Sequence, residues 1–285
     1  MTDHVTLFEM GPRDGLQNEK AMIATADKIK LVDMLTDCGF SKIEVTSFVS
    51  PKWVPQMADA SDVLAGITRA DGVSYAALTP NMRGLTGAQA AKANEVAIFG
   101  SASEGFSQTN INCSIDESLE RFAPVLEAAK AVGLPVRGYV SCTVECPFDG
   151  ATPPENVLRV TKALLDMGCY EVSLADTIGT ATPSGISRML DAVLTEVAPE
   201  LLAGHYHDTG GRALDNIKVS LDKGLRVFDA AVGGLGGCPY APGAQGNVAT
   251  ESVVAMLEAH GYATGIDQEA LAKAAAFAQS LKEIA

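Results

Sequence analysis

Eight short apolar stretches, each followed by a segment with helical periodicity, constrain the fold of this sequence most strongly. We predict strands over residues 5–9, 42–46, 74–78, 95–100, 135–142, 171–176, 203–207 and 227–232. Several stretches, such as 96–99 (VAIF), are apolar at every position, which is typical of a parallel sheet covered on both faces. Eight β/α units in a chain of 285 residues predict an α/β fold, a closed (β/α)8 TIM barrel.

The segments between the strands carry apolar residues at helical spacing. Residues 25–38, 116–132, 153–167 and 183–197 are the clearest helices, and glycines directly after the first three suit a backbone with positive φ. We predict one domain over residues 1–285, with the barrel over about 4–262 and an additional C-terminal helix over about 266–285. The alternative is an open doubly wound sheet, but no glycine-rich nucleotide-binding turn follows the first strand.

Charge and hydropathy exclude several classes of partner. The formal net charge of −14 argues against non-specific attraction to nucleic acid or to an anionic membrane. No stretch approaches the roughly 20 apolar residues of a membrane span. The N-terminus leads directly into the first strand and leaves no room for a signal peptide. The six cysteines lack zinc-ribbon spacing, and Cys142 and Cys146, the one close pair, are expected to be reduced, with one of them buried. We therefore predict a cytoplasmic location, with no nucleic-acid or membrane partner.

Polar side chains gather where the predicted strands end. In a TIM barrel the C-terminal ends of the strands carry the functional residues. Here these positions hold two histidines, one arginine and several carboxylates: Arg13, Asp14, Glu44, Asp176, His205, His207 and Asp208. Each has an ordinary alternative role, since an aspartate at a strand end often caps the next helix and paired histidines are often structural. Their convergence on one rim nevertheless predicts a functional site.

Strand alternation places His205 and His207 on one face and Tyr206 on the other. Two imidazoles on one face can chelate a divalent ion if other segments supply further ligands. Glu44 interrupts an apolar strand and needs a partner, for which Arg13 is the natural candidate. The glycine-rich segment 233–247 has no G-x-G-x-x-G spacing, and we interpret it as a mobile lid whose reactive side chain is Cys238.

At these residues the sequence resembles the hydroxymethylglutaryl-CoA lyases, which belong to a metal-dependent superfamily of TIM-barrel lyases and synthases. The resemblance runs nearly end to end and is carried by segments 11–19 (GPRDGLQNE), 110–114 (NINCS), 137–142 (RGYVSC), 176–179 (DTIG) and 205–209 (HYHDT). The most specific segment is 234–240 (GLGGCPY). The resemblance implies a divalent metal, Mg²⁺ or Mn²⁺, with the ligands Asp14, His205, His207 and Asn247. It also implies catalytic or supporting roles for Arg13, Glu44, Asp176, His205, Cys238 and Glu251.

The reaction implied by the resemblance is cleavage of 3-hydroxy-3-methylglutaryl-CoA to acetyl-CoA and acetoacetate. Either Asp176 or His205 takes the hydroxyl proton, and Cys238 is the candidate proton donor to the acetyl carbon. Arg13 is expected to neutralise the thioester oxygen. We expect the acyl-CoA to lie across the rim, near candidate cofactor-binding residues Gln17, Asn18, Lys20 and Arg137. A homodimer is expected because barrels of this kind commonly form dimers.

The sequence also departs from the family pattern near the predicted pocket. Tyr206 replaces a cysteine that is usual between the histidines, and Gly210-Gly211 replaces Tyr-Gly. These changes leave open the same chemistry on a larger branched 3-hydroxyacyl-CoA. An acyl-CoA condensing synthase on the same barrel, or a non-catalytic scaffold that binds metal and acyl-CoA, would also fit the predicted metal ligands.

Overall fold

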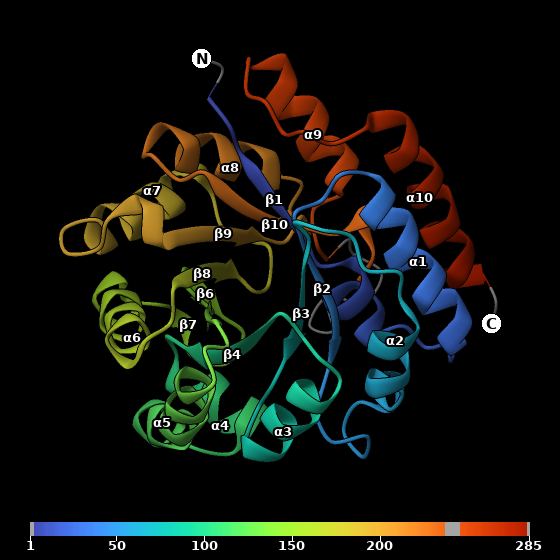
Figure 1. Ribbon diagram of the computed structural model, residues 1–285. Coiled ribbons are helices and arrows are strands. Elements are labelled where there is room, and N and C mark those ends of the chain that lie inside the picture. The colour runs from blue at the N-terminus through green and yellow to red at the C-terminus, as the bar shows by residue number, and fades with distance from the viewer. Residues whose placement is uncertain (1–2, 237–245, 284–285) are drawn as a thin grey trace.

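The computed structural model describes residues 3–236 and 246–283 as a closed barrel of eight parallel strands (Figure 1). The strands follow one another around the barrel in the order β1-β10-β9-β8-β5-β4-β3-β2. Their bounds are β1 Thr6–Glu9, β2 Lys42–Ser47, β3 Ser74–Leu78, β4 Glu95–Ser101, β5 Val136–Ser141, β8 Glu171–Asp176, β9 Leu202–Tyr206 and β10 Val227–Ala230. The predicted TIM barrel is confirmed, and the open sheet is wrong.

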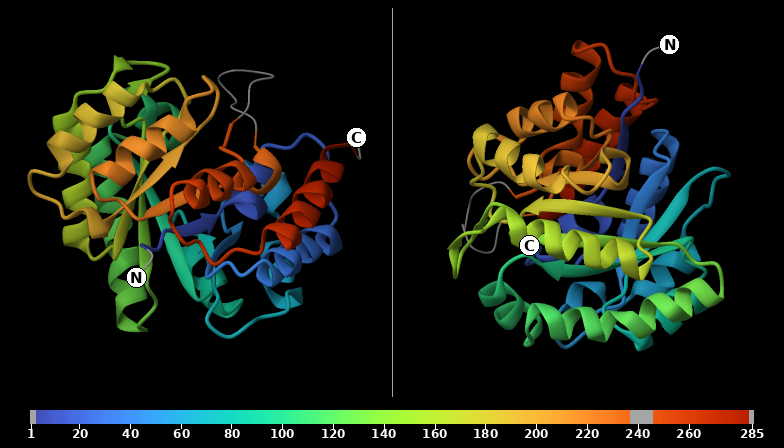
Figure 2. Two further views of the ribbon diagram at one scale, coloured as in Figure 1. Left: turned by 90° about the horizontal axis from the view of Figure 1, so that it is seen from above. Right: turned by 90° about the vertical axis from the view of Figure 1, so that its left-hand side faces the viewer.

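Helices form a layer around the strands, as the views in Figures 1 and 2 show. They are α1 Thr25–Asp37, α2 Ala60–Gly66, α3 Met82–Ala90, α4 Glu104–Ile111, α5 Ile115–Ala131, α6 Pro154–Met167, α7 Pro183–Val193, α8 Ala213–Asp222, α9 Thr250–Ala259 and α10 Gln268–Ser280. The predicted C-terminal helix is α10, which packs beside α1 on the outside of the barrel. Within the described ranges, no helix is long and apolar enough to cross a membrane.

Several short elements were not predicted from the sequence. The π-helical turn η1 (Gly11–Gly15) follows β1, and the 3-10 turn η4 (Val232–Gly234) follows β10. Further 3-10 turns are η2 (Pro55–Met57), η3 (Pro199–Leu201) and η5 (Leu281–Glu283). A hairpin of β6 (Glu145–Cys146) and β7 (Gly150–Ala151) follows β5. Strands of two residues carry no readable periodicity, so the hairpin could not be predicted. Cys142 and Cys146 are both free thiols and both buried.

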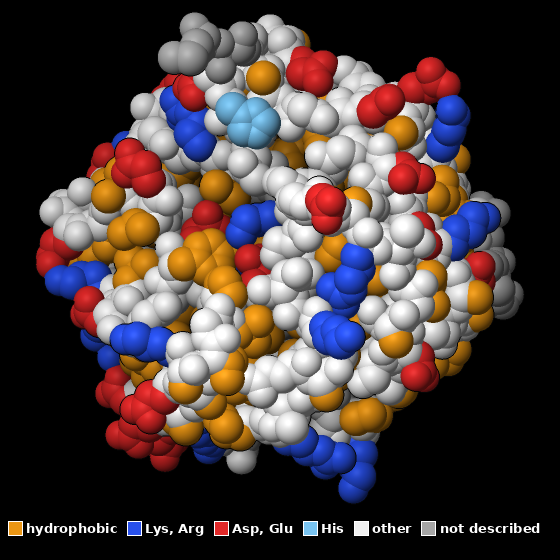
Figure 3. Space-filling model, viewed as in Figure 1, with side chains coloured by type: hydrophobic (Ala, Val, Ile, Leu, Met, Phe, Trp, Pro, Cys, Tyr) orange, Lys and Arg blue, Asp and Glu red, His pale blue; other side chains and the backbone are white. Residues whose placement is uncertain are grey.

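The interior of the barrel is divided between apolar and ionic side chains. One small apolar cluster, formed by strands β1, β3, β4 and β5, contains Phe8, Met10, Ala76, Leu78, Ala97 and Tyr139. The buried ionisable groups Arg137, His205 and Asp229 come from strands β5, β9 and β10. The main hydrophobic core is a separate, larger cluster. On the face shown in Figure 3, Lys and Arg side chains are interspersed with Asp and Glu side chains.

Candidate active site

The turn η1 places two charged side chains at the rim of the barrel. The carbonyl oxygen of Met10 accepts the backbone N–H groups of Arg13, Asp14 and Gly15, at 3.2, 2.8 and 3.1 Å. This widened turn is common at functional sites, where it reorients side chains. A Cβ atom on Gly15 would lie 2.6 Å from Cβ of Leu235, so only glycine lets η1 pack closely against the segment after η4.

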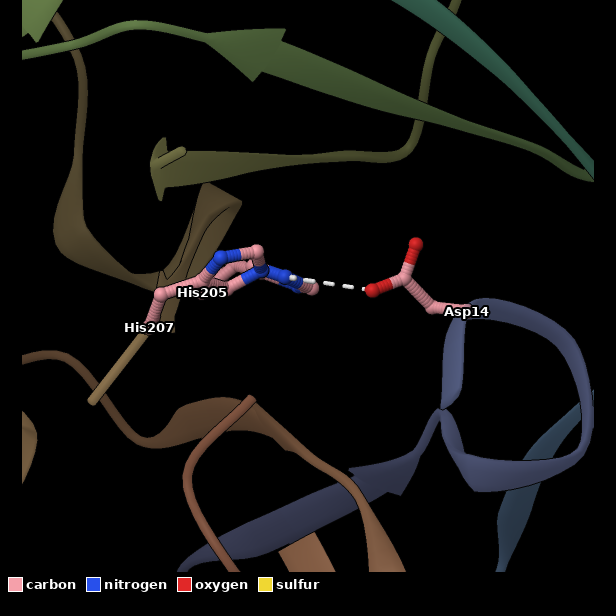
Figure 4. Close-up of side chains that lie close together, drawn as sticks. All are labelled: Asp14, His205 and His207. Atoms are coloured by element: carbon pink, nitrogen blue, oxygen red, sulfur yellow. Dashed lines mark ion pairs between the residues drawn. The ribbon is translucent and has the colours of Figure 1, made fainter. Parts of the chain in front are cut away.

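Asp14 of η1 faces His205 and His207 of the β9 segment (Figure 4). One potential ligand atom of each residue lies within 4.8 Å of the others. Asn247 is adjacent, because its Nδ2 donates to Oδ2 of Asp14 at 2.8 Å and to the carbonyl of Leu235 at 3.3 Å. Its amide oxygen is then the atom that can coordinate. Two imidazoles, a carboxylate and an amide form a donor set that fits a divalent cation.

The protonation states of Asp14 and His207 also suit a metal. For His205, burial would lower the pKa, but its hydrogen bond with Asp229 and the charges of Asp229 and Asp14 outweigh burial and raise it. Burial would raise the pKa of Asp14, but the charge of Arg13 and the nearby histidines hold that pKa well below its usual value. Burial and the neighbouring His205 lower the pKa of His207 to about 4. Asp14 is therefore a carboxylate and His207 a neutral imidazole near pH 7, which are the forms that bind metals.

Arg13 and Glu44 form a buried ion pair beside this cluster. Nε and Nη2 of Arg13 both lie 2.6 Å from Oε2 of Glu44, and Nη1 lies 2.5 Å from Oδ1 of Asp14. Arg13 is 6% exposed and Glu44 is fully buried. Burial alone would lower the pKa of Arg13, but the charges of Glu44 and Asp14 outweigh it and raise that pKa. The guanidinium is thus held in one orientation with a permanent charge.

Asp176 ends β8, and the strand register pairs it with Tyr206 on β9, the residue between the two histidines. Its Oδ2 accepts the backbone N–H of Ala181 at 3.0 Å, while Oδ1 is buried and has no hydrogen-bond partner in the part of the chain that the structure describes. Burial raises the pKa of Asp176 to about 6. A carboxylate with a pKa close to the working pH and one free oxygen is suited to accept a proton.

The sequence matches the HMGL-like family over residues 4–278. The chain belongs to this family. It is 57% identical to the mitochondrial hydroxymethylglutaryl-CoA lyase of Bos taurus, over 96% of this chain and 84% of that protein. It is also 57% identical to the 3-hydroxy-3-isohexenylglutaryl-CoA/hydroxymethylglutaryl-CoA lyase of Pseudomonas aeruginosa, over 95% and 90%. The crystal structure of the HMG-CoA lyase from Brucella melitensis superposes with a TM-score of 0.98, at 61% identity over 99% of both chains.

The other residues predicted for an HMGL-like site lie in several places. Glu251 is half-buried in the first turn of α9 and accepts the backbone N–H of Gly233 at 2.9 Å, so its visible contact is with η4. Asn18 and Lys20 are exposed and Gln17 is half-buried, just beyond η1. Cys238 lies outside the described residues.

The prediction that Arg137 lies at the rim is wrong. Arg137 is the second residue of β5, is 1% exposed and points into the barrel interior, where it pairs with Glu171 and Asp229. Alternation along a strand tells which face a side chain occupies, but depth along the barrel depends on its distance from the strand end. Residues at the start of a strand lie far from the C-terminal rim, so Arg137 is not placed to contact an acyl-CoA there.

Two residues flanking the site were missed by the sequence analysis. Glu9 accepts hydrogen bonds from the N–H groups of Gly11 and Val232 and from Oγ1 of Thr250, at 2.7–2.8 Å, and so ties η1 to η4 and α9. Asp229 lies 3.1 Å from Nδ1 of His205. Both are carboxylates inside apolar strands, the same signal that singled out Glu44.

Two further residues near the rim, Tyr206 and Asp208, have structural roles. Tyr206 is 1% exposed and its hydroxyl lies 2.7 Å from Oγ of Ser220 on α8, so it faces away from the histidines, as alternation predicts. Asp208 accepts the backbone N–H of Ala213, the first residue of α8, and therefore holds the start of that helix.

Proposed function

We propose that this chain is a divalent-metal-dependent carbon–carbon lyase that cleaves 3-hydroxy-3-methylglutaryl-CoA to acetyl-CoA and acetoacetate. One observation carries the proposal above all: the cluster of Asp14, His205 and His207 lies beside the buried Arg13–Glu44 pair at the functional rim of a barrel. The family relationship supports it, since relatives at 57% identity are named as hydroxymethylglutaryl-CoA lyases. The relatives compared above are lyases, which favours cleavage over a condensing synthase or a non-catalytic scaffold.

The reaction breaks the bond between C2 and C3 of the acyl group. The tertiary hydroxyl at C3 loses its proton and becomes the ketone of acetoacetate, while the bonding electrons pass to C2 and form the enolate of the acetyl thioester. We propose that Asp14, His205, His207 and Asn247 hold Mg²⁺ or Mn²⁺. When bound, such an ion supplies Lewis-acid polarisation and orientation of oxygen ligands.

Arg13 is our candidate for stabilising the enolate. Glu44 and Asp14 hold its guanidinium in place, and it keeps its charge at any pH of interest. A donor fixed before the reaction stabilises the negative charge that develops on the thioester oxygen, without reorganisation during the step. Glu44 is therefore a positioning residue for Arg13.

Asp176 is our candidate for accepting the hydroxyl proton. His205 is the competing candidate, but its Nδ1 lies 3.1 Å from the carboxylate of Asp229, and its Nε2 faces Asp14 within the proposed metal cluster. Both ring nitrogens of His205 are thus engaged, whereas Oδ1 of Asp176 is not hydrogen-bonded to any described residue. A pKa of about 6 leaves Asp176 mostly ionised at pH 7 and able to act as the base.

This assignment predicts a pH dependence. We expect kcat/KM to fall as the pH drops below about 6, because protonation of Asp176 removes the base. Asp176→Asn should lower kcat by about 10²–10⁴-fold and abolish this acidic limb. The measurement is kcat/KM from pH 5 to pH 8 in both proteins, at saturating metal. If the acidic limb persists unchanged in Asp176→Asn, the acceptor of the hydroxyl proton is His205 and not Asp176.

The remaining roles are predictions that no contact in the described residues tests. Cys238 is retained as the proton donor to the acetyl carbon, and Glu251 as a support of the neighbouring loop. We retain Gln17, Asn18 and Lys20 as candidate contacts for the coenzyme A part, because they follow η1 and are exposed or half-buried there. The homodimer and the cytoplasmic location also remain predictions.

A larger substrate is a second candidate, because the Pseudomonas aeruginosa relative is named for both the isohexenyl and the methyl substrate. Tyr206, one of the departures that raised this possibility, faces α8 and does not shape the site. We therefore expect the methyl substrate to be preferred. The test compares kcat/KM for 3-hydroxy-3-methylglutaryl-CoA and 3-hydroxy-3-isohexenylglutaryl-CoA with the same protein. A higher value for the isohexenyl compound would reassign the substrate and leave the reaction type intact.

A further inference from the structure

Asp229 lies directly behind one of the proposed metal ligands. It is the third residue of β10, and the strand register pairs it with His205 on β9. Its Oδ2 lies 3.1 Å from Nδ1 of His205. Asp229 is 2% exposed, so this contact is made inside the barrel and out of reach of solvent.

A buried network holds the Asp229 carboxylate in place. Nη1 of Arg137 donates to Oδ2 at 3.0 Å, and Nη2 of Arg137 lies 2.8 Å from Oδ1. Oγ of Ser173, on β8, donates to Oδ2 at 2.8 Å. Arg137 is fixed in turn, because its Nε donates to Glu171 at 2.7 Å and its Nη1 donates to the hydroxyl of Tyr139 at 3.1 Å. This network joins strands β5, β8, β9 and β10.

These contacts determine which nitrogen of His205 carries the proton. An aspartate paired with a buried arginine is ionised, and an ionised carboxylate can only accept hydrogen bonds. Nδ1 of His205 must therefore be the donor to Oδ2 of Asp229. In the neutral ring, Nε2 then carries the lone pair, and Nε2 is the nitrogen that faces Asp14, 3.9 Å from its Oδ2.

We propose that Asp229 is a positioning residue that holds His205 as its Nδ1–H tautomer, with Nε2 turned toward the metal cluster, and that the ion pair with Arg137 fixes Asp229 for this purpose. The proposal rests on the proposed function in one respect only, which is that His205 is a metal ligand. Partners of this kind behind a ligating histidine typically contribute 10–100-fold to metal affinity. The sequence analysis expected Arg137 to contact the substrate. In this proposal Arg137 instead acts on the metal site indirectly, through Asp229.

Asp229→Asn is the variant that tests this role. An asparagine has nearly the same shape, but it offers one carbonyl oxygen and one amide N–H₂ group. Both carboxylate oxygens of Asp229 face Arg137, and Oδ2 also faces His205 and Ser173. An amide N–H₂ group in either position opposes a donor of Arg137, and the negative charge that makes Asp229 an obligatory acceptor is lost. The Nδ1–H tautomer of His205 is then no longer enforced, and the Nε2–H tautomer, which blocks coordination, becomes populated. We expect the dissociation constant for Mn²⁺ to rise about 10–100-fold.

Ser173→Ala is the matched control. It removes one hydrogen bond from the same carboxylate and leaves Asp229 ionised and paired with Arg137. We expect His205 to remain the Nδ1–H tautomer in this variant, with Mn²⁺ affinity within about threefold of the parent, since the partner of the ligand itself is intact. A general loosening of the barrel would instead weaken binding in both variants alike.

The experiment has two readouts, neither of which uses an acyl-CoA. The chain has only four histidines, so ¹⁵N–¹H correlation spectra of the metal-free protein resolve their tautomers, with His205→Gln assigning the signal. The spectra are recorded at alkaline pH, where the His205 ring is neutral, because the hydrogen bond with Asp229 and the nearby carboxylate charges together outweigh burial and raise the pKa of His205. Calorimetric titration with Mn²⁺ gives the dissociation constants. An Nδ1–H tautomer in the parent and weakened Mn²⁺ binding in Asp229→Asn, but not in Ser173→Ala, would support the proposal. An Nε2–H tautomer in the parent would overturn it, whether or not Asp229→Asn folds. Equal Mn²⁺ affinity in the parent and in folded Asp229→Asn would do the same.

Discussion

Arg13→Gln is expected to lower kcat by about 10²–10³-fold, the usual cost of removing one fixed donor from a developing negative charge. The guanidinium is proposed to face the thioester oxygen only as charge grows there, so KM should change much less than kcat. The measurement is steady-state kinetics with 3-hydroxy-3-methylglutaryl-CoA at saturating metal. A parental kcat would remove Arg13 from the mechanism.

The same substitution should also destabilise the protein, because Glu44 is fully buried and its ion-pair partner is Arg13. Leaving a buried carboxylate without its partner costs about 3–5 kcal/mol of the free energy of unfolding. The double variant Arg13→Gln/Glu44→Gln provides the control, since two neutral amides can pair with each other. We expect it to recover most of the lost stability, measured by urea unfolding, and none of the lost kcat. Recovery of both together would mean that Arg13 acts through the fold alone.

His207→Gln is expected to weaken metal binding more than about 100-fold, which is beyond the usual effect of partners behind the ligands. Burial and His205 hold the pKa of His207 at about 4, so its ring is available to a cation throughout the neutral range. Turnover at limiting metal should fall in parallel. Calorimetric titration with Mn²⁺ measures the loss of affinity directly.

His4→Gln is the matched control, because it also replaces one histidine of the chain by glutamine. His4 is exposed and pairs with Ala263 at the opposite end of the barrel from η1. Its replacement should leave the affinity for Mn²⁺ unchanged. Equal affinities in the parent, His4→Gln and His207→Gln would show that the Asp14, His205 and His207 cluster is not the metal site.

The fold could be predicted because each barrel strand is a short apolar run followed by a helical pattern. The predicted strand ends lie within two residues of those in the structure, and β3 and β8 match at both ends. The hairpin of β6 and β7 and the turn η1 could not be predicted, because two-residue strands and a π-helical turn leave no periodic signal.

Much of the site could also be predicted, because barrel geometry assigns function to residues at the ends of strands. That rule brought together Asp14, His205 and His207 from distant segments. It failed for residues deeper in the barrel. Asp229 was overlooked within an apolar run, and Arg137 was assigned to the rim although it begins its strand. Sequence pattern gives the face of a side chain, but the partner across the barrel depends on strand order and register.

The most direct test of the central claim is product formation by the metal-loaded protein from 3-hydroxy-3-methylglutaryl-CoA, with a chelator-treated sample alongside. We expect acetyl-CoA and acetoacetate in equal amounts, loss of both on chelation, and recovery on adding Mg²⁺ or Mn²⁺. Formation of neither product by folded, metal-loaded protein would contradict the proposed lyase activity, and equal turnover in the chelated sample would contradict the role of the metal.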